Sequence, residues 1–326
     1  MNTRDFGSVW TLKEIKIFWK KILYLVMSHG RDNKMKLLVL GGYGYLGNKI
    51  ILKALSKNWE VISVSKKKNR RLLKHKNLKN LFFDMNNLNK LKSLSKYQFD
   101  YVINVSGYVD HSSFSKNGIE IANNHLIMIL NLVFILNRKK LKKFIQIGSS
   151  EEYGIKSCSL LETNRELPFT PYAASKVAST HFLQMLNRSE SFPVTIMRLF
   201  LVYGPDQKSN RIIPYVIQNC QKNRTFKVSE GKQLRDFIFI DDAVDAIFIC
   251  LKSSKAIGQI YNLGSGEGIT IKLLVNAIKK IIGGGKPKFG SYKNLRKENT
   301  KLIAKISKIK KDLKVETKSE FRNWFK

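Results

Sequence analysis

Residues 36–47 read KLLVLGGYGYLG, an apolar run that leads directly into a glycine-rich loop. The next segment, NKIILKALSKNW (48–59), has apolar residues at the spacing of a helix. A glycine loop between a strand and a helix lets the backbone approach a pyrophosphate, whose charge the helix N-terminus stabilises. The stretch predicts a dinucleotide-binding fold, and the alternative is a purely structural turn. The predicted cofactor-binding positions are Gly41, Gly44, Tyr45, Leu46 and Gly47.

More apolar runs follow, with helical stretches between several of them: EVISVS (60–65), NLFFD (80–84), YVINVSG (101–107) and KFIQIGS (143–149). This alternation indicates a parallel sheet covered on both faces, with ligands at the carboxyl ends of the strands. We predict an α/β fold with a doubly wound, Rossmann-like parallel sheet. Residues 35–200 would form the dinucleotide-binding domain, and residues 201–326 mainly a smaller, partly interleaved substrate-binding lobe.

The net charge is +35, from 59 basic and 24 acidic residues. Such a charge attracts polyanions, but no short nucleic-acid-binding motif accompanies it. Lys, Asn and Ile are frequent along the entire chain, which indicates a compositional trend, and a phosphate-bearing small substrate would also suit the charge. We therefore expect no nucleic-acid partner.

The three cysteines, Cys158, Cys220 and Cys250, are far apart and lack metal-binding spacing. The five histidines do not cluster either. These patterns predict no metal site and fit a reduced, cytoplasmic location.

The first 34 residues contain VWTLKEIKIFWKKILYLVM, in which lysines interrupt aromatic and aliphatic residues. This is the pattern of an amphipathic helix on a membrane surface, and it is too interrupted to span a bilayer. The alternative is an extension upstream of a natural domain start at Met35. In both cases we expect residues 1–34 to carry no catalytic group.

The second predicted strand ends at Ser65, where a carboxylate would bind the ribose 2′-hydroxyl of NAD. Six residues that are almost all cationic follow, including Lys66 and Arg70. A serine followed by cations suits the 2′-phosphate of NADP better than the 2′-hydroxyl of NAD. The sequence therefore favours NADP over NAD, although the general excess of lysine would also explain the run.

The segment TPYAASKVASTHFLQML (170–186) predicts a helix capped by Thr170. Tyr172 and Lys176 are four residues apart and share one face of it. A nearby ammonium lowers the pKa of a phenol, which can then exchange a proton with an alcohol or carbonyl oxygen. Ser149, at the end of a predicted strand, can hold that oxygen. These three residues are the predicted catalytic set.

Six segments together resemble the extended short-chain dehydrogenase/reductases, in the branch of nucleotide-sugar epimerases, dehydratases and 4-keto reductases. They are GGYGYLG, GSSEEYG, PYAASK, RLFLVYGPDQ, LRDFIFIDDAVDAI and YNLGSGE. The resemblance runs from about Lys36 to about residue 315. It implies an enzyme that transfers hydride at C4 of a nucleotide-linked hexose. A nucleotide-diphosphate sugar is then the expected partner, and a homodimer the expected assembly.

The resemblance also implies roles for single residues. Asp84 and Met85 would lie near the adenine, and Ser106 and Gly107 would border the cofactor. Lys176 would hold the nicotinamide ribose in addition to its place beside Ser149 and Tyr172.

Two arginines would serve the substrate. Arg235 would pair with the diphosphate, a natural task for a guanidinium, and Arg211 would assist. The alternative for Arg235 is an ion pair with Asp236 or Asp241.

Within GSSEEYG (148–154), Ser150 and Glu151 stand where dehydratases of the family place an additional acid and base. Those enzymes often show threonine, then an acidic or polar residue, then glutamate. Here the first two places are serines, so elimination of water is less favoured. Glu152 is expected to shape the turn.

The sequence departs from the family pattern at two positions near the substrate. His125 stands where many members carry an asparagine, and it is either a packed or a functional histidine. Leu201 replaces the asparagine of the common RLFN motif. Both changes leave the identity of the sugar open.

The leading interpretation is an NADPH-dependent 4-keto-sugar reductase. The alternative is an NAD-dependent nucleotide-sugar 4-epimerase, and a 4,6-dehydratase is less favoured. A non-catalytic dinucleotide- or RNA-binding member is the interpretation from a different class, and the complete Ser149, Tyr172 and Lys176 set argues against it.

Overall fold

The computed structural model describes residues 34–68, 73–156, 159–291 and 300–317. The chain divides into two units at Met35, and the description below concerns the unit Lys36–Lys326. The extension predicted at residues 1–34 lies outside the described residues, except for Lys34.

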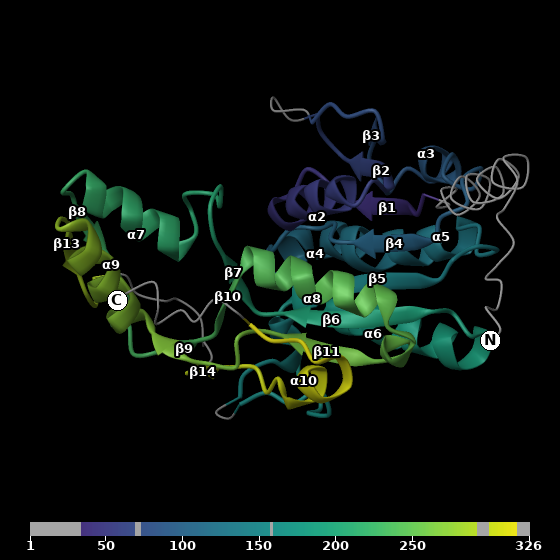
Figure 1. Cartoon of the computed structure of the whole chain (residues 1–326). Helices are drawn as coiled ribbons and strands as arrows, with labels where there is room; N and C mark the ends of the chain where they lie inside the picture. The colour runs from purple at the N-terminus through teal and green to yellow at the C-terminus, as the bar shows by residue number, and fades with distance from the viewer. Residues whose placement is uncertain (1–33, 69–72, 157–158, 292–299, 318–326) are drawn as a thin grey trace, which may run out of the picture. The chain divides into compact units, whose positions relative to one another are not determined.

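The main sheet has seven parallel strands in the order β11-β6-β5-β4-β1-β2-β3 (Figure 1). From β1 the chain first adds strands in one direction and then in the other, so the winding reverses between β1 and β4. Ligands of open parallel sheets bind at such a switch point. The strands are β1 (Lys36–Leu40), β2 (Glu60–Ser65), β3 (Leu78–Phe82), β4 (Tyr101–Asn104), β5 (Lys143–Ser149), β6 (Val194–Leu199) and β11 (Ile260–Leu263).

Helices cover both faces of this sheet, which explains why its central strands are apolar along their whole length. Figure 1 shows α2 (Tyr45–Ser56) and α8 (Ile240–Lys252) on the near face. The other face packs against α3 (Leu88–Lys92), α5 (Met128–Ile135) and α6 (Pro171–Glu190). The predicted doubly wound α/β fold is confirmed.

The strands divide their side chains between the two faces by simple alternation. Leu38 and Leu40 of β1 belong to the same core cluster as Leu132 of α5 and Leu183 of α6. All four are fully buried. This packing places the ends of β1, β4 and β5 at fixed positions along one edge.

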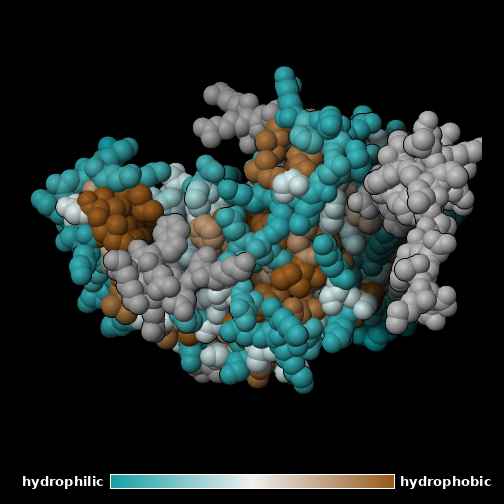
Figure 2. All heavy atoms as spheres, in the orientation of Figure 1, coloured by the Kyte–Doolittle hydropathy of each residue, from teal (hydrophilic) through white to brown (hydrophobic). Residues whose placement is uncertain are grey.

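A smaller lobe is built around α7 (Ile212–Gln221) and α9 (Ile271–Ile282), with its own apolar core. Figure 2 shows hydrophilic residues over most of the visible face, with one apolar area over this lobe and another over the middle of the α/β part. The lobe's short strands are β7 (Leu201–Tyr203), β8 (Thr225–Lys227), β9 (Leu234–Arg235), β10 (Phe237–Phe239), β12 (Ile269–Thr270), β13 (Lys286–Lys288) and β14 (Lys301–Leu302).

The chain enters the small lobe, returns to the main sheet with α8 and β11, and then enters the lobe again with β12 and α9. After β14 it returns once more, and α10 (Ser307–Leu313) packs beside β11. The two parts of this unit are therefore joined by several crossings of the backbone.

The segment Phe114–Ile135 is apolar and long enough to cross a membrane by length and composition, with a mean hydropathy of 1.5. It comprises α4 (Phe114–Ala122), a π-helical turn η1 (Asn123–Ile127) and α5. Its buried residues Met128, Ile129, Leu132 and Val133 belong to the core of the sheet. A core helix of this kind passes the same test, so the segment is weak evidence for a membrane span.

Candidate active site

A cavity of about 910 Å³ lies at the carboxyl ends of the central strands. It is lined by segments that are far apart in sequence, and its size is at the upper end for ligand sites. Most of the predicted site residues line it: Gly44, Tyr45, Leu46, Gly47, Ser106, Gly107, Ser149, Ser150, Glu151, Tyr172, Lys176, Arg211 and Arg235.

The glycine loop requires glycine at two positions. Gly41 has a φ of +80°, and a Cβ there would lie 2.8 Å from the Cα of Ser106. A Cβ on Gly47 would lie 2.3 Å from the carbonyl oxygen of Gly41. Gly44 precedes α2 without a side-chain cap, so backbone N–H groups of the first turn face the cavity. This arrangement fits a pyrophosphate.

The predicted 2′-phosphate site is already engaged by other groups. The Ser65 hydroxyl accepts a hydrogen bond from the backbone N–H of Tyr43 at 3.1 Å. The Lys66 ammonium lies 2.7 Å from the Asp84 carboxylate and, by hydrogen bonding, lowers the pKa of that carboxyl. Neither Ser65 nor Lys66 lines the cavity. The same holds for Asp84, and Arg70 lies outside the described residues.

Two other predicted cofactor residues also lie outside the cavity wall. Met85 packs against the apolar core of the main sheet. Gly41 lies under the loop, against Ser106.

The structure brings Ser149, Tyr172 and Lys176 together. The Thr170 hydroxyl accepts a hydrogen bond from the N–H of Ala173, so α6 begins as predicted and directs Tyr172 into the cavity. The Lys176 ammonium lies 6.0 Å from the centre of the Tyr172 ring and donates to the carbonyl of Ile147 at 2.9 Å.

The expected lowering of the Tyr172 pKa is not found. Burial raises the pKa of this phenol, the hydrogen bond with Ser149 opposes the rise, and the charge of Glu151 adds to it. Burial also lowers the pKa of Lys176 to about 8, so its ammonium is itself disfavoured. The prediction was wrong because it counted the charge of the lysine and omitted the burial of both groups.

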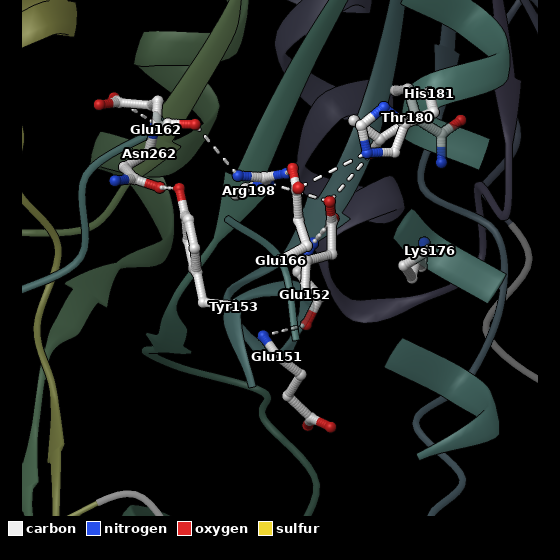
Figure 3. Close-up of polar contacts among 12 residues, drawn as sticks. Glu151, Glu152, Tyr153, Glu162, Glu166, Lys176, Thr180, His181, Arg198 and Asn262 are labelled. Atoms are coloured by element: carbon white, nitrogen blue, oxygen red, sulfur yellow. Dashed lines mark hydrogen bonds and ion pairs between the residues drawn. The ribbon is translucent and has the colours of Figure 1, made fainter. Parts of the chain in front are cut away.

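A buried ionic network holds the turn after β5 (Figure 3). One Glu152 oxygen accepts from the N–H of Ser149 at 2.8 Å, and the other accepts from Arg198 at 2.9 Å and from Thr180 at 3.0 Å. Arg198 also pairs with Glu166. Glu152 therefore shapes this turn, as expected, while Figure 3 shows the Glu151 carboxylate pointing away from the network.

His125 packs directly against Tyr172. Its ring centre lies 4.9 Å from that of Tyr172 in an edge-on arrangement, and its Nε2 donates to the carbonyl of Tyr108 at 3.0 Å. Burial lowers the pKa of His125 to about 3, so the ring is neutral. A Cβ on Gly107 would lie 2.2 Å from His125, so glycine is needed there. Of the two alternatives, the contacts support packing.

Two further groups were missed at the level of sequence. Arg198 is fully buried and 46 residues from its partner Glu152. His111 lines the cavity and contacts Glu151, which is 40 residues away. No local pattern relates residues at such separations, although an arginine within an apolar strand such as VTIMRL signals a buried ionic partner.

Arg211 and Arg235, from elements of the small lobe, both line the cavity. Arg211 immediately precedes α7, and Arg235 donates to the carbonyl of Leu234 at 2.9 Å. The neighbouring Asp236 accepts hydrogen bonds from the backbone of Ser265, Gly266 and Ala304, so its carboxylate organises loops of the lobe. Two guanidinium groups at one wall suit a diphosphate.

Cys220 and Cys250 are buried free thiols, and Cys158 lies outside the described residues. Within the described part of the chain, no group of three His, Cys, Asp or Glu side chains is arranged to hold a metal ion.

Comparison with known proteins gives relatives among nucleotide-sugar enzymes. The chain is 30% identical over 273 residues to the dTDP-D-glucose 4,6-dehydratase of Dictyostelium discoideum, covering 76% of this chain and 61% of that enzyme. It is 27% identical over 246 residues to the UDP-glucuronate 4-epimerase of Thermodesulfobacterium geofontis, covering 74% and 75% of the two chains.

The fold is likewise similar to a solved structure, the UDP-glucuronic acid 4-epimerase of Bacillus cereus in complex with UDP-glucuronic acid and NAD. The TM-score is 0.81 at 24% identity, covering 89% of this chain and 96% of that one. Residues 37–264 match the model of a family described as NAD dependent epimerase/dehydratase family. With the glycine loop, the Ser149–Tyr172–Lys176 set and this match in agreement, the chain belongs to the NAD dependent epimerase/dehydratase family.

Proposed function

We propose that this protein oxidises C4 of a nucleotide-linked hexose and returns the hydride to the same sugar within one catalytic cycle. The observation that carries the proposal is the convergence of Ser149, Tyr172 and Lys176 with the glycine loop in one cavity. Epimerisation and dehydration both proceed in this way, and the relatives reported above are named for these two activities.

The residues divide the work of the hydride transfer. A bound nicotinamide dinucleotide would accept the hydride and return it. Tyr172 removes the proton of the C4 hydroxyl, and the Ser149 hydroxyl holds that oxygen. Lys176, fixed by the carbonyl of Ile147, adds positive charge beneath the phenol. Arg211 and Arg235 hold the diphosphate of the substrate.

The 4-keto reductase interpretation is now less well supported than its alternative, an NAD-dependent nucleotide-sugar 4-epimerase. It depended on an exchangeable NADPH, and the Ser65 hydroxyl and the Lys66 ammonium both have partners within the protein. The relatives reported above are a dehydratase and an epimerase. We therefore favour a retained NAD, which suits a reaction that returns its hydride.

The experiment is to incubate the protein with NAD and a panel of UDP-, dTDP-, GDP- and CDP-linked hexoses, and to identify products by NMR. We expect conversion without net consumption of NADH or NADPH. Tyr172→Phe should lower turnover by about 10²–10⁴-fold with cofactor binding retained. Tyr97→Phe is the matched control, because Tyr97 is partly buried against the apolar core and does not line the cavity. Stoichiometric consumption of NADPH would reinstate the reductase.

Two expectations about the context of the enzyme are part of the proposal. The first is a cytoplasmic location.

The second is a homodimer. Exposed apolar side chains along Phe114–Ile135, among them Phe114, Ile119 and Phe134, support this assembly. Sedimentation velocity should give the mass of a dimer, and Ile119→Glu should shift it toward the monomer. A monomeric parent protein would remove this part of the proposal.

A further inference from the structure

We propose that the outer end of the small lobe binds the surface of an anionic membrane. This surface, called here the basic end, is formed by α9, by the paired strands β8 and β13, and by the turn that follows α7. Figure 1 shows these elements at the end of the lobe farthest from the main sheet. The proposal concerns a part of the molecule outside the cavity and does not depend on the reaction.

The segments that build the basic end contain no carboxylate side chain. Residues 212–228 and 269–291 contain eight basic and no acidic residues, and all eight basic side chains are exposed. The whole chain, by comparison, has 24 acidic residues beside its 59 basic ones. The general excess of lysine accounts for the presence of cations here, but it does not account for the missing acidic residues. The positive charge of these segments is therefore uncompensated by their own side chains and attracts an external anion.

The two strands place three lysines together on one outward face. β8 and β13 are parallel, and their pairing sets Lys227 opposite Lys288 and Thr225 opposite Lys286. Phe226 lies between the two outward positions of β8 and is buried in the lobe core, so the lysines point to the other side. Like charges directly opposite each other destabilise a strand pair. An anionic surface laid over the pair would remove this repulsion.

α9 supplies the apolar part of the basic end. Its inner face, which includes Leu274 and Ile278, is buried in the lobe core. Leu273, Ala277 and Ile281 follow one another at intervals of four residues and form a strip on the outer face. The Leu273 and Ile281 side chains are 61% and 59% exposed. Large aliphatic side chains between cations suit insertion at the boundary between lipid headgroups and acyl chains.

The helix and the strands are neighbours along their length. The glycine turn at 283–285 joins the end of α9 directly to Lys286, the first residue of β13. After the other end of β13, the Phe289 ring lies 5.7 Å from the ammonium of Lys272, which is at the start of α9. β13 therefore runs back along α9. Figure 2 shows an apolar area over this lobe with hydrophilic residues around it.

The combination of cations with aliphatic side chains favours a lipid surface over a nucleic acid. Each lysine or arginine near anionic headgroups strengthens binding to a membrane, and inserted aliphatic side chains add to it. A nucleic acid would use the same cations, but aliphatic side chains give its bases no platform for stacking. Since both partners carry phosphate, the experiment has to separate them.

The test measures cosedimentation of the full chain with vesicles of phosphatidylglycerol and phosphatidylcholine. We expect binding that weakens with added salt, and no binding to vesicles of phosphatidylcholine alone. Lys279→Glu combined with Lys280→Glu should lower the affinity by about tenfold or more. Leu273→Gln combined with Ile281→Gln should lower it by about tenfold, because the inserted apolar area is lost. Circular dichroism checks that each variant is folded.

α10 provides the matched control. Lys310 and Lys311 are adjacent lysines in the last turn of a helix, as Lys279 and Lys280 are in α9. Unlike α9, α10 has its aliphatic side chains buried. Lys310→Glu combined with Lys311→Glu should therefore bind vesicles like the parent. All of these variants keep residues 1–34, so a difference between them cannot come from that segment.

Three results would contradict the proposal. The first is equal vesicle binding by the parent and the Lys279→Glu, Lys280→Glu variant, or an equal loss in the α10 control. The second is binding of the parent to a short DNA duplex but not to the anionic vesicles, which would make a nucleic acid the partner. The third is a lower mass of the Leu273→Gln, Ile281→Gln variant by sedimentation velocity, which would assign the strip to a contact between copies of the chain.

Discussion

The Arg198 guanidinium lies 2.9 Å from the Glu152 carboxylate, and neither side chain is exposed to solvent. The other oxygen of Glu152 accepts a hydrogen bond from the backbone N–H of Ser149, so a buried ion pair holds the backbone of Ser149 in place. Arg198 also stacks over Tyr153, with 4.5 Å between the guanidinium carbon and the ring centre. The position of Ser149 thus depends on a charge pair inside the core.

Arg198→Met should lower the free energy of unfolding by about 3–5 kcal/mol, because it leaves the Glu152 carboxylate buried without its partner. Urea unfolding measures this loss. Arg138→Met is the matched control, since Arg138 pairs with Glu190 at the surface and its loss should cost about 0–1 kcal/mol. Equal losses in the two variants would contradict a special role for the buried pair.

The parts of the fold that were predictable are those with local signals. EVISVS became β2 (Glu60–Ser65) with both ends as expected, because cations follow the apolar run at once. Thr170 caps α6 as predicted, since a threonine before a proline is a local start signal.

The parts that were not predictable depend on contacts between distant segments. LIAKISKIKKDL (302–313) has the apolar spacing of one helix, but α10 begins only at Ser307. Leu302 pairs with β9, and Ala304 forms a bridge to Leu160, so tertiary pairing overrides the local pattern. The Glu151–His111 and Glu152–Arg198 contacts have no local signal for the same reason.

Activity should fall as the pH rises through about 8, where buried Lys176 loses its proton. Lys176→Arg should abolish this fall, because guanidinium keeps its charge, and the pH profile of kcat/KM is the measurement. Between this pKa and the ordinary value of 10.5, the unfolded chain still binds the proton that the folded protein has released. The stability contributed by this group therefore rises with pH while activity falls. A profile that stays flat through pH 8 would exclude Lys176 as the titrating group.

The purified protein should carry NAD or NADH, identified by mass spectrometry after heat release. Asp84→Asn frees Lys66 from its partner and should raise the affinity for NADPH relative to NADH by about tenfold or more, since a charge-assisted hydrogen bond contributes roughly 1.5–3 kcal/mol. Lys66→Ala should leave the parent's preference unchanged. Bound NADP in the parent, or a lost NADPH preference in Lys66→Ala, would restore the original expectation drawn from Ser65 and Arg70.

A chain that begins at Met35 should turn over substrate like the full chain, because β1 begins at Lys36 and every residue assigned to the cavity follows it. The removed segment carries seven basic and three acidic residues together with its aromatic and aliphatic ones. If it is an amphipathic membrane-surface helix, the full chain should cosediment with anionic vesicles more strongly than the shortened one, and the difference should shrink as salt screens the charge. Equal cosedimentation of the two chains would leave the upstream-extension interpretation. A shortened chain that is folded by circular dichroism yet inactive would show that residues 1–34 contribute to catalysis, contrary to the prediction.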